Sequence, residues 1–231
     1  MKWSDYILEV RKREREPYEL VNSLIESLYG GSVEINVPVT RCLHATIGLT
    51  TEIGECFEAW TIAAADNLGR YDRKNLEEEI GDIFWYTGLL LDAAGFPLKD
   101  LQEFDDSYLE DFLPAWNNLR TDLALQYVLI NCTKLLDIAK KYFVYGKKDV
   151  FIGDALAGLT EAHIHNLYLL CASLNLNPEE LRQMNCNKLQ ARYGDGFSND
   201  AALNRNVEAE RAAMLDDIDE AKEMTEYHNV N

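Results

Sequence analysis

The stretch Glu52-Ile53-Gly54-Glu55-Cys56-Phe57 recurs in nearly the same form as Glu79-Ile80-Gly81-Asp82-Ile83-Phe84. Each copy places two carboxylates three residues apart, and on a helix that spacing puts both on one face. The apolar residues of each copy fall on the adjacent face, as in an amphipathic helix. The repeated stretch therefore predicts two helices that each carry a pair of acids beside an apolar seam.

The two acidic pairs share one midpoint in the sequence. Glu52 and Asp82 are centred on Asn67, and so are Glu55 and Glu79. If two antiparallel helices fold back about a turn there, all four acids meet at one level. Clustered carboxylates repel one another, so we expect a cation between them. Oxygen ligands of this kind favour Mg²⁺, with Mn²⁺ as the alternative, over zinc.

Helical periodicity extends over most of the chain, and only 13 Gly and 5 Pro interrupt its 231 residues. We therefore predict an all-α helical bundle, in one domain over 1–231. The expected elements are helices at 17–29, 40–65 (capped by Thr40), 74–94 (ending at Gly95), 120–144, 151–174 and 178–193, an extended connector at 33–39, and an acidic helix or frayed tail at 206–231.

Two helix junctions lie 80 residues apart and suggest an internal duplication. The stretches 95–101 and 175–181 each follow an apolar helix and open another. We predict two tandem helical units, 40–105 with the acidic motif and 120–200 without it. At this offset Leu159 and Ala162 stand opposite Glu79 and Asp82. A coincidence of spacing between two helix junctions is the alternative interpretation.

The overall charge limits the classes of partner. Forty acids against 22 bases give a net charge of −18, which argues against a broad electrostatic grip on nucleic acid or on an anionic membrane. No stretch approaches the ~20 apolar residues of a membrane span, and the N-terminal residues lack a signal-peptide apolar region. Five scattered cysteines without CxxC spacing indicate buried thiols in a reducing compartment. We expect a cytoplasmic protein.

A cluster of polar residues late in the chain complements the acids. Asn185, Lys188 and Arg192 follow an i, i+3, i+7 pattern and are followed by Tyr193, so one helix face presents an amide, an ammonium and a guanidinium. This set suits phosphate oxygens. Exposed, solubilising bases are the alternative interpretation.

The acidic pairs Glu52-x-x-Glu55 and Glu79-x-x-Asp82, with 23 residues between them, resemble the signature of the all-α nucleoside triphosphate pyrophosphohydrolases. That family includes MazG-like proteins and dimeric dUTPases. The stretch 47–55, IGLTTEIGE, is also family-like. The stretch 185–197, NCNKLQARYGDGF, resembles the family's closing N-x-x-K-L-x-x-R-Y-P-x-G-F pattern, with Gly194 in place of proline.

The resemblance implies an activity and a division of roles. Mg²⁺ would be held by Glu52, Glu55, Glu79 and Asp82, and the triphosphate by Asn185, Lys188, Arg192 and Tyr193. Metal-activated water would convert a nucleoside triphosphate to the monophosphate and pyrophosphate. The dUTPase side of the resemblance favours a deoxynucleotide. Family members of this kind build their sites between the helix bundles of two subunits, and we expect this chain to form a homo-oligomer, a dimer or higher.

Several side assignments stay open. Base recognition could involve aromatic residues near the acids, although a core position is the alternative for each: His44, Trp60, Phe84, Trp85 and Tyr86. Glu58 and Glu78 could orient a ligand or could be ordinary surface glutamates. More than 100 residues separate Asp82 from Asn185, where compact family members have far fewer. A non-catalytic metal-binding scaffold and an acidic interaction protein are the rival functions.

Overall fold

The computed structural model describes residues 1–14, 18, 37–65, 72–97, 119–145 and 154–215. Within these residues the regular elements are all helices, so the predicted all-α fold class is confirmed. The helices are α1 (Trp3–Arg13), α3 (Val37–Ala65), α4 (Arg73–Ala94), α7 (Thr121–Tyr145), α8 (Asp154–Ser173), α9 (Pro178–Tyr193), α10 (Asn199–Leu203) and α11 (Val207–Leu215).

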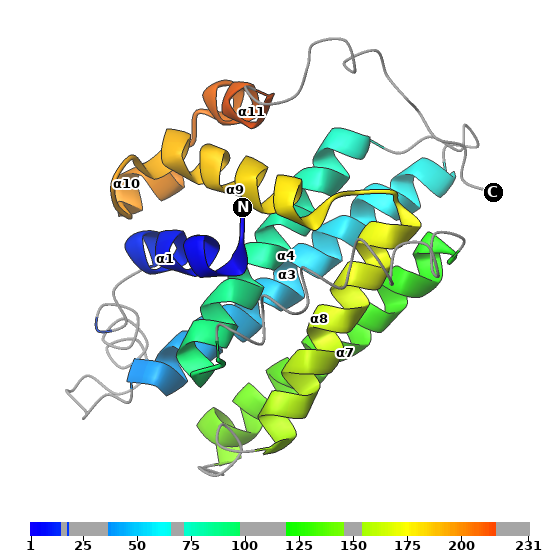
Figure 1. Ribbon diagram of the computed structural model, residues 1–231, viewed down its shortest axis with the longest axis vertical. Coiled ribbons are helices and arrows are strands. Elements are labelled where there is room, and N and C mark those ends of the chain that lie inside the picture. The colour runs from blue at the N-terminus through cyan, green and yellow to red at the C-terminus, as the bar shows by residue number, and fades with distance from the viewer. Residues whose placement is uncertain (15–17, 19–36, 66–71, 98–118, 146–153, 216–231) are drawn as a thin grey trace.

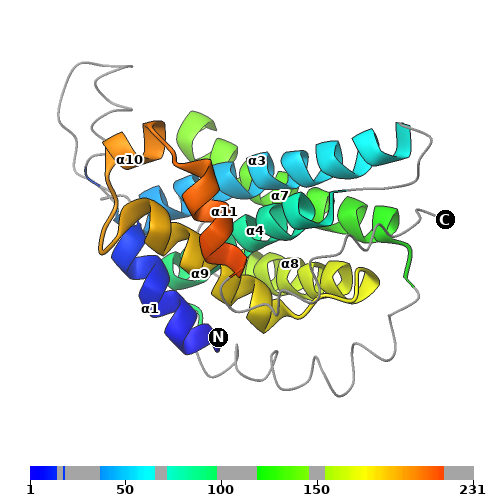
Figure 2. The ribbon, with the colours of Figure 1, turned by 90° about the horizontal axis from the view of Figure 1, so that it is seen from above.

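Four long helices form the centre of the molecule. α3 and α4 run antiparallel and pack on each other, α7 and α8 do the same, and α3 also packs on α7 (Figure 1). α1 and α9 pack on α4, and α11 packs on α9 (Figure 2). Among the described helices, none has both the length and the apolar character that a membrane span requires.

Local sequence signals set several helix ends, and the end at Gly95 and the start at Pro178 agree with the prediction. The carboxylate of Asp72 accepts a hydrogen bond from the backbone N–H of Asn75 at 3.1 Å and caps the start of α4. α4 ends at Gly95, which has a left-handed φ of 72°. α9 begins with Pro178, and the side chain of Asn177 caps it by accepting from the N–H of Glu179 at 2.9 Å.

The start of α3 differs from the prediction. The helix begins at Val37, so Thr40 is not its cap and 37–39 are not an extended connector. Pro38 is compatible with this start, because the first turn of a helix leaves its N–H groups unpaired and proline has none to lose. α11 occupies part of the predicted acidic tail. The predicted helix at 17–29 lies outside the described residues except for Tyr18, and 216–231 lie outside them too.

α1 was not predicted. Its apolar residues Trp3, Tyr6, Ile7 and Val10 are buried, and they follow the i, i+3, i+4, i+7 spacing of a helix face. α1 approaches α4 closely at Gly88, where an added Cβ would lie 3.1 Å from the side chain of Val10. α1 thus covers the side of α4 that faces away from α3.

The two helix junctions 80 residues apart have the same hydrogen bonds. After α4, Phe96 N–H donates to the carbonyl of Leu91 at 2.9 Å; after α8, Leu176 N–H donates to the carbonyl of Cys171 at 2.9 Å. The residue before each donor is left-handed, Gly95 in one junction and Asn175, with φ of 53°, in the other. The α3–α4 and α7–α8 pairs are thus related by one offset, while the duplication itself stays a prediction.

Candidate functional site

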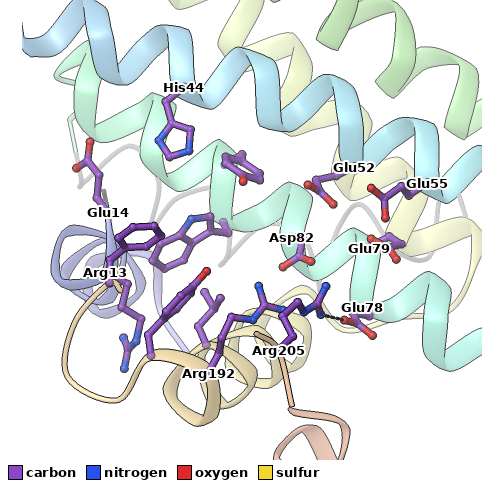
Figure 3. A pocket seen from close by; sticks show the side chains of 15 residues that line it. Arg13, Glu14, His44, Glu52, Glu55, Glu78, Glu79, Asp82, Arg192 and Arg205 are labelled. Carbon is purple, nitrogen blue, oxygen red and sulfur yellow. Dashed lines mark hydrogen bonds and ion pairs between the residues drawn. The ribbon is translucent and has the colours of Figure 1, made fainter. Parts of the chain in front are cut away.

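A cavity of about 200 Å³ opens between α3, α4 and α9 (Figure 3). Acids of α3 and α4 form one wall: Glu52, Glu55, Glu78, Glu79 and Asp82. The opposite wall carries Arg192 and Tyr193 from the end of α9, together with Arg205 from the connection between α10 and α11. The cavity therefore joins a carboxylate-rich wall to a guanidinium-bearing one.

Three of the four predicted acids converge. Glu52, Glu55 and Glu79 each offer a carboxylate oxygen, and these oxygens lie within 4.8 Å of one another. Glu79 is buried at 8% exposure, whereas Glu55 is exposed. Within the part of the chain that the structure describes, none of the three makes an ion pair with a basic side chain. An all-oxygen donor set of this kind fits a hard divalent cation such as Mg²⁺ or Mn²⁺.

The electrostatics of this cluster point the same way. Burial raises the pKa of Glu79 to about 8, and the neighbouring carboxylates of Asp82, Glu55 and Glu52 add to the shift. Burial likewise raises the pKa of Glu52 to about 7, with Asp82 and Glu55 contributing. Without a cation, these two groups therefore hold protons near neutral pH, and a bound cation would displace them.

Asp82 has different partners. It accepts a hydrogen bond from the side-chain amide of Asn185 at 2.6 Å and pairs with the ammonium of Lys188 at 2.5 Å. Lys188 is fully buried and also lies 3.4 Å from Glu78. The two predicted substrate residues Asn185 and Lys188 thus contact acids of α4 directly and do not line the cavity.

Arg192 and Tyr193 line the cavity as a ligand-contacting role requires. The guanidinium of Arg192 donates to both carboxylate oxygens of Glu210, at 3.0 and 2.6 Å. The ring of Tyr193 lies 5.3 Å, centroid to centroid, from that of Phe197. Arg205 and Glu210 were not singled out from the sequence, because they stand in a polar stretch without a motif.

Aromatic candidates divide between the cavity and the core. His44, Trp85 and Tyr86 line the cavity, and the rings of His44 and Tyr86 meet edge to face at 5.6 Å. Phe84 is fully buried in the core, and Trp60 does not line the cavity. Of the two open glutamates, Glu78 lines the cavity while Glu58 is exposed outside it.

Glycine allows close packing of helices at Gly48 and Gly81. A Cβ added at Gly48 would lie 2.3 Å from the Tyr86 ring, so this glycine lets α4 seat Tyr86 against α3. A Cβ added at Gly81 would lie 3.3 Å from Asn185 Cβ, so this glycine lets α9 approach the acids of α4 closely. A Cβ added at Gly54 would have no described neighbour within 4 Å, so no close approach requires glycine there.

The second helix pair carries apolar residues at the positions equivalent to the acids. At an offset of 80, Cys132 and Leu135 of α7 occupy the positions of Glu52 and Glu55, and both are fully buried.

A comparison of the chain with family models, curated proteins and solved structures found no match. The family resemblance therefore rests on the motifs quoted above.

Proposed function

We propose that this protein is a Mg²⁺-dependent nucleoside triphosphate pyrophosphohydrolase, with Mn²⁺ as an alternative cofactor. The observation that carries the proposal is the convergence of the Glu52, Glu55 and Glu79 carboxylates within 4.8 Å, facing two arginines across one cavity. The products would be a nucleoside monophosphate and pyrophosphate, formed with the uptake of one water. A deoxynucleotide is the preferred substrate, from the family resemblance alone.

The residues of the cavity would share the work. Glu52, Glu55 and Glu79 would hold the cation, which supplies positive charge to phosphate oxygens as the phosphoanhydride bond breaks. Arg192 would bind phosphate oxygens through its planar fork of N–H donors. Trp85 and Tyr86 line the cavity and are the candidates for contact with the base.

Lys188 and Asn185 would act on the site through Asp82, without contacting the substrate. By binding Asp82 they compensate the charge of one acid beside the metal site, and this fixes the orientation of its carboxylate. The cavity volume of about 200 Å³ is below the ~300–1,000 Å³ of most small-molecule sites. We therefore expect the polyphosphate, rather than the whole nucleotide, to be enclosed.

The test is a panel of the common NTPs and dNTPs plus dUTP, with and without Mg²⁺, with products separated by ion exchange. We expect monophosphate and pyrophosphate with metal only. Glu55→Gln should lower the rate by about a hundredfold or more, and since Glu55 is exposed the variant should fold. Glu58→Gln is the matched control, one turn away on the same helix and outside the cavity. Diphosphate and orthophosphate as products, or full activity in Glu55→Gln, would contradict the proposal.

A non-catalytic metal-binding scaffold is the second candidate, favoured by the internal partners of Asp82 and Arg192. A scaffold would be stabilised by Mg²⁺ without turning over any nucleotide of the panel. Binding to the folded state alone raises stability by ~2.7 kcal/mol at a metal concentration of 100 Kd, and thermal unfolding would detect this. Stabilisation without hydrolysis would select the scaffold.

A further inference from the structure

Two arginines of the cavity are joined by one buried carboxylate. Glu210 of α11 is only 2% exposed. It accepts hydrogen bonds from Nε and Nη2 of Arg192 at 3.0 and 2.6 Å, and from Nε and Nη2 of Arg205 at 3.2 and 2.8 Å. Both arginines line the cavity and Glu210 does not. The carboxylate therefore lies behind the two guanidinium groups.

Neither arginine uses its whole guanidinium on Glu210. A guanidinium has five N–H groups in a planar fork, and each arginine turns only its Nε–Nη2 edge to the carboxylate. The Nη1 group of each arginine stays outside this pairing. Two guanidinium groups fixed at one carboxylate can thus still offer donors to an anion on the cavity side.

The charged groups of this wall compensate one another, in contrast to the acids Glu52, Glu55 and Glu79 opposite. Lys188 pairs with Asp82 and Glu78, and Glu78 also lies 3.5 Å from Arg205. The three bases Lys188, Arg192 and Arg205 balance the three acids Asp82, Glu78 and Glu210. An anion at this wall therefore meets guanidinium donors without net repulsion. Figure 3 shows Arg192 and Arg205 facing the acids of α3 and α4 across the cavity.

We propose that Arg205, together with Arg192, binds the polyphosphate chain, and that Glu210 is a positioning residue that holds both guanidinium groups toward the cavity. This proposal rests on the proposed function for the identity of the natural ligand, a nucleoside triphosphate. The binding step itself concerns polyphosphate and is measurable without turnover. Arg205 is thus a substrate-contacting residue that the acidic and basic motifs do not include.

The experiment is isothermal titration calorimetry of the full chain with inorganic tripolyphosphate, with and without Mg²⁺, and then with the nucleotide preferred in the panel. Arg205→Gln and Glu210→Gln should each weaken tripolyphosphate binding by about tenfold or more, the worth of one charge-assisted hydrogen bond. Since Glu210 acts through the arginines, the double variant should lose less than the product of the two single losses.

A second arginine–carboxylate pair supplies the control. Arg120 donates through Nε and Nη2 to the two oxygens of Asp122, at 3.0 and 2.5 Å, in the same bidentate pattern but away from the cavity. Arg120→Gln and Asp122→Asn should leave binding unchanged. Thermal unfolding of every variant separates lost binding from lost fold. If Glu210→Gln unfolds, Arg205→Gln and Arg205→Lys carry the test, with lysine expected to recover part of the affinity.

Four results would overturn the proposal. Equal or tighter binding in Glu210→Gln would mean that Glu210 competes with phosphate. Unchanged binding in Arg205→Gln would mean that Arg205 only forms a surface ion pair. No binding of tripolyphosphate by the unaltered protein would mean that the cavity has no polyphosphate site. Binding of tripolyphosphate without hydrolysis of any nucleotide would instead reject the proposed function and leave the polyphosphate site of Arg192 and Arg205 intact. Hydrolysis unaffected in both variants would reject that site and leave the proposed function.

Discussion

Lys188 illustrates how a single buried charge decides the roles of its neighbours. Its ammonium is fully buried and lies 2.5 Å from Asp82 and 3.4 Å from Glu78. A buried charge is tolerated only when it is paired, and removal of one partner costs ~3–5 kcal/mol. The spacing of Asn185, Lys188 and Arg192 predicted one polar helix face, but spacing along one helix does not specify which acid on another helix will pair with it.

His163 gives a prediction at the same scale. It is fully buried, and its Nε2 lies 3.0 Å from the hydroxyl of Thr87, which itself donates to the carbonyl of Ile83 at 2.7 Å. The hydroxyl can then only accept from His163, so Nε2 carries the proton of a neutral ring. Burial lowers the pKa of His163 to about 4, from 6.5.

Because the unfolded chain binds this proton more readily, His163 destabilises the fold as pH falls. Its contribution is fully present above pH 6.5 and is lost progressively between pH 6.5 and 4, by about 3 kcal/mol. His163→Gln should flatten the pH dependence of the free energy of unfolding in that window, measured by urea denaturation. His165→Gln, exposed on the same helix, should alter it much less; equal effects of the two variants would refute the assignment.

Among the elements, α3 and α4 owe their close pairing to one glycine. Gly48 leaves room for the Tyr86 ring, and a methyl group there would lie 2.3 Å from it. The helix ends were predictable because Asp72, Gly95 and the Asn177-Pro178 pair act on their own backbone. The spacing of Trp3, Tyr6, Ile7 and Val10 also carries a helical signal, from which α1 can be predicted.

Two glycines of one helix make a matched pair. Gly48→Ala should destabilise the protein by ~1–3 kcal/mol, because the added methyl overpacks the α3–α4 contact. Gly54→Ala should stabilise it by ~0.5–1 kcal/mol, because nothing lies within 4 Å and alanine favours the helix. Urea denaturation followed by circular dichroism measures both. Similar effects at the two positions would show that α4 does not press on Gly48.

Across the whole molecule, the site combines segments that are distant in the sequence. Glu52 and Arg205 face the same cavity although 153 positions separate them. The acids could be predicted because their two helices are neighbours in the chain and share a midpoint. Arg205 and Glu210 could not, because their positions depend on α11 packing back on α9, a contact that leaves no local pattern.

The reactivity of the cysteines measures whether the helices remain packed together. All five are buried, as predicted, and they are distributed over α3, α7, α8 and α9. Burial raises the pKa of Cys42, Cys132 and Cys186 to about 12, so the thiolate that reacts is scarce in the folded state. We expect no thiol to react with a disulfide reagent in native buffer and all five to react in denaturant.

Peptide mapping of alkylated protein at intermediate denaturant adds a finer test. The five thiols should become reactive together if the described helices unfold as one unit. Earlier labelling of Cys186 than of Cys132 would contradict this expectation. It would mean that α9 detaches before the central helices open, so that the cavity loses its arginine wall first.

The order of synthesis gives the divided cavity a further consequence. Ala94 ends α4, and the ribosome adds another 115 residues before it reaches Glu210. At ~5–20 residues per second this takes roughly 5–25 s. During that interval the acids of α3 and α4 can already face one another, while the arginines of the other wall are unmade or unheld. If the proposed function holds, a nascent chain would have the residues that hold the metal ion well before it has those that hold the nucleotide.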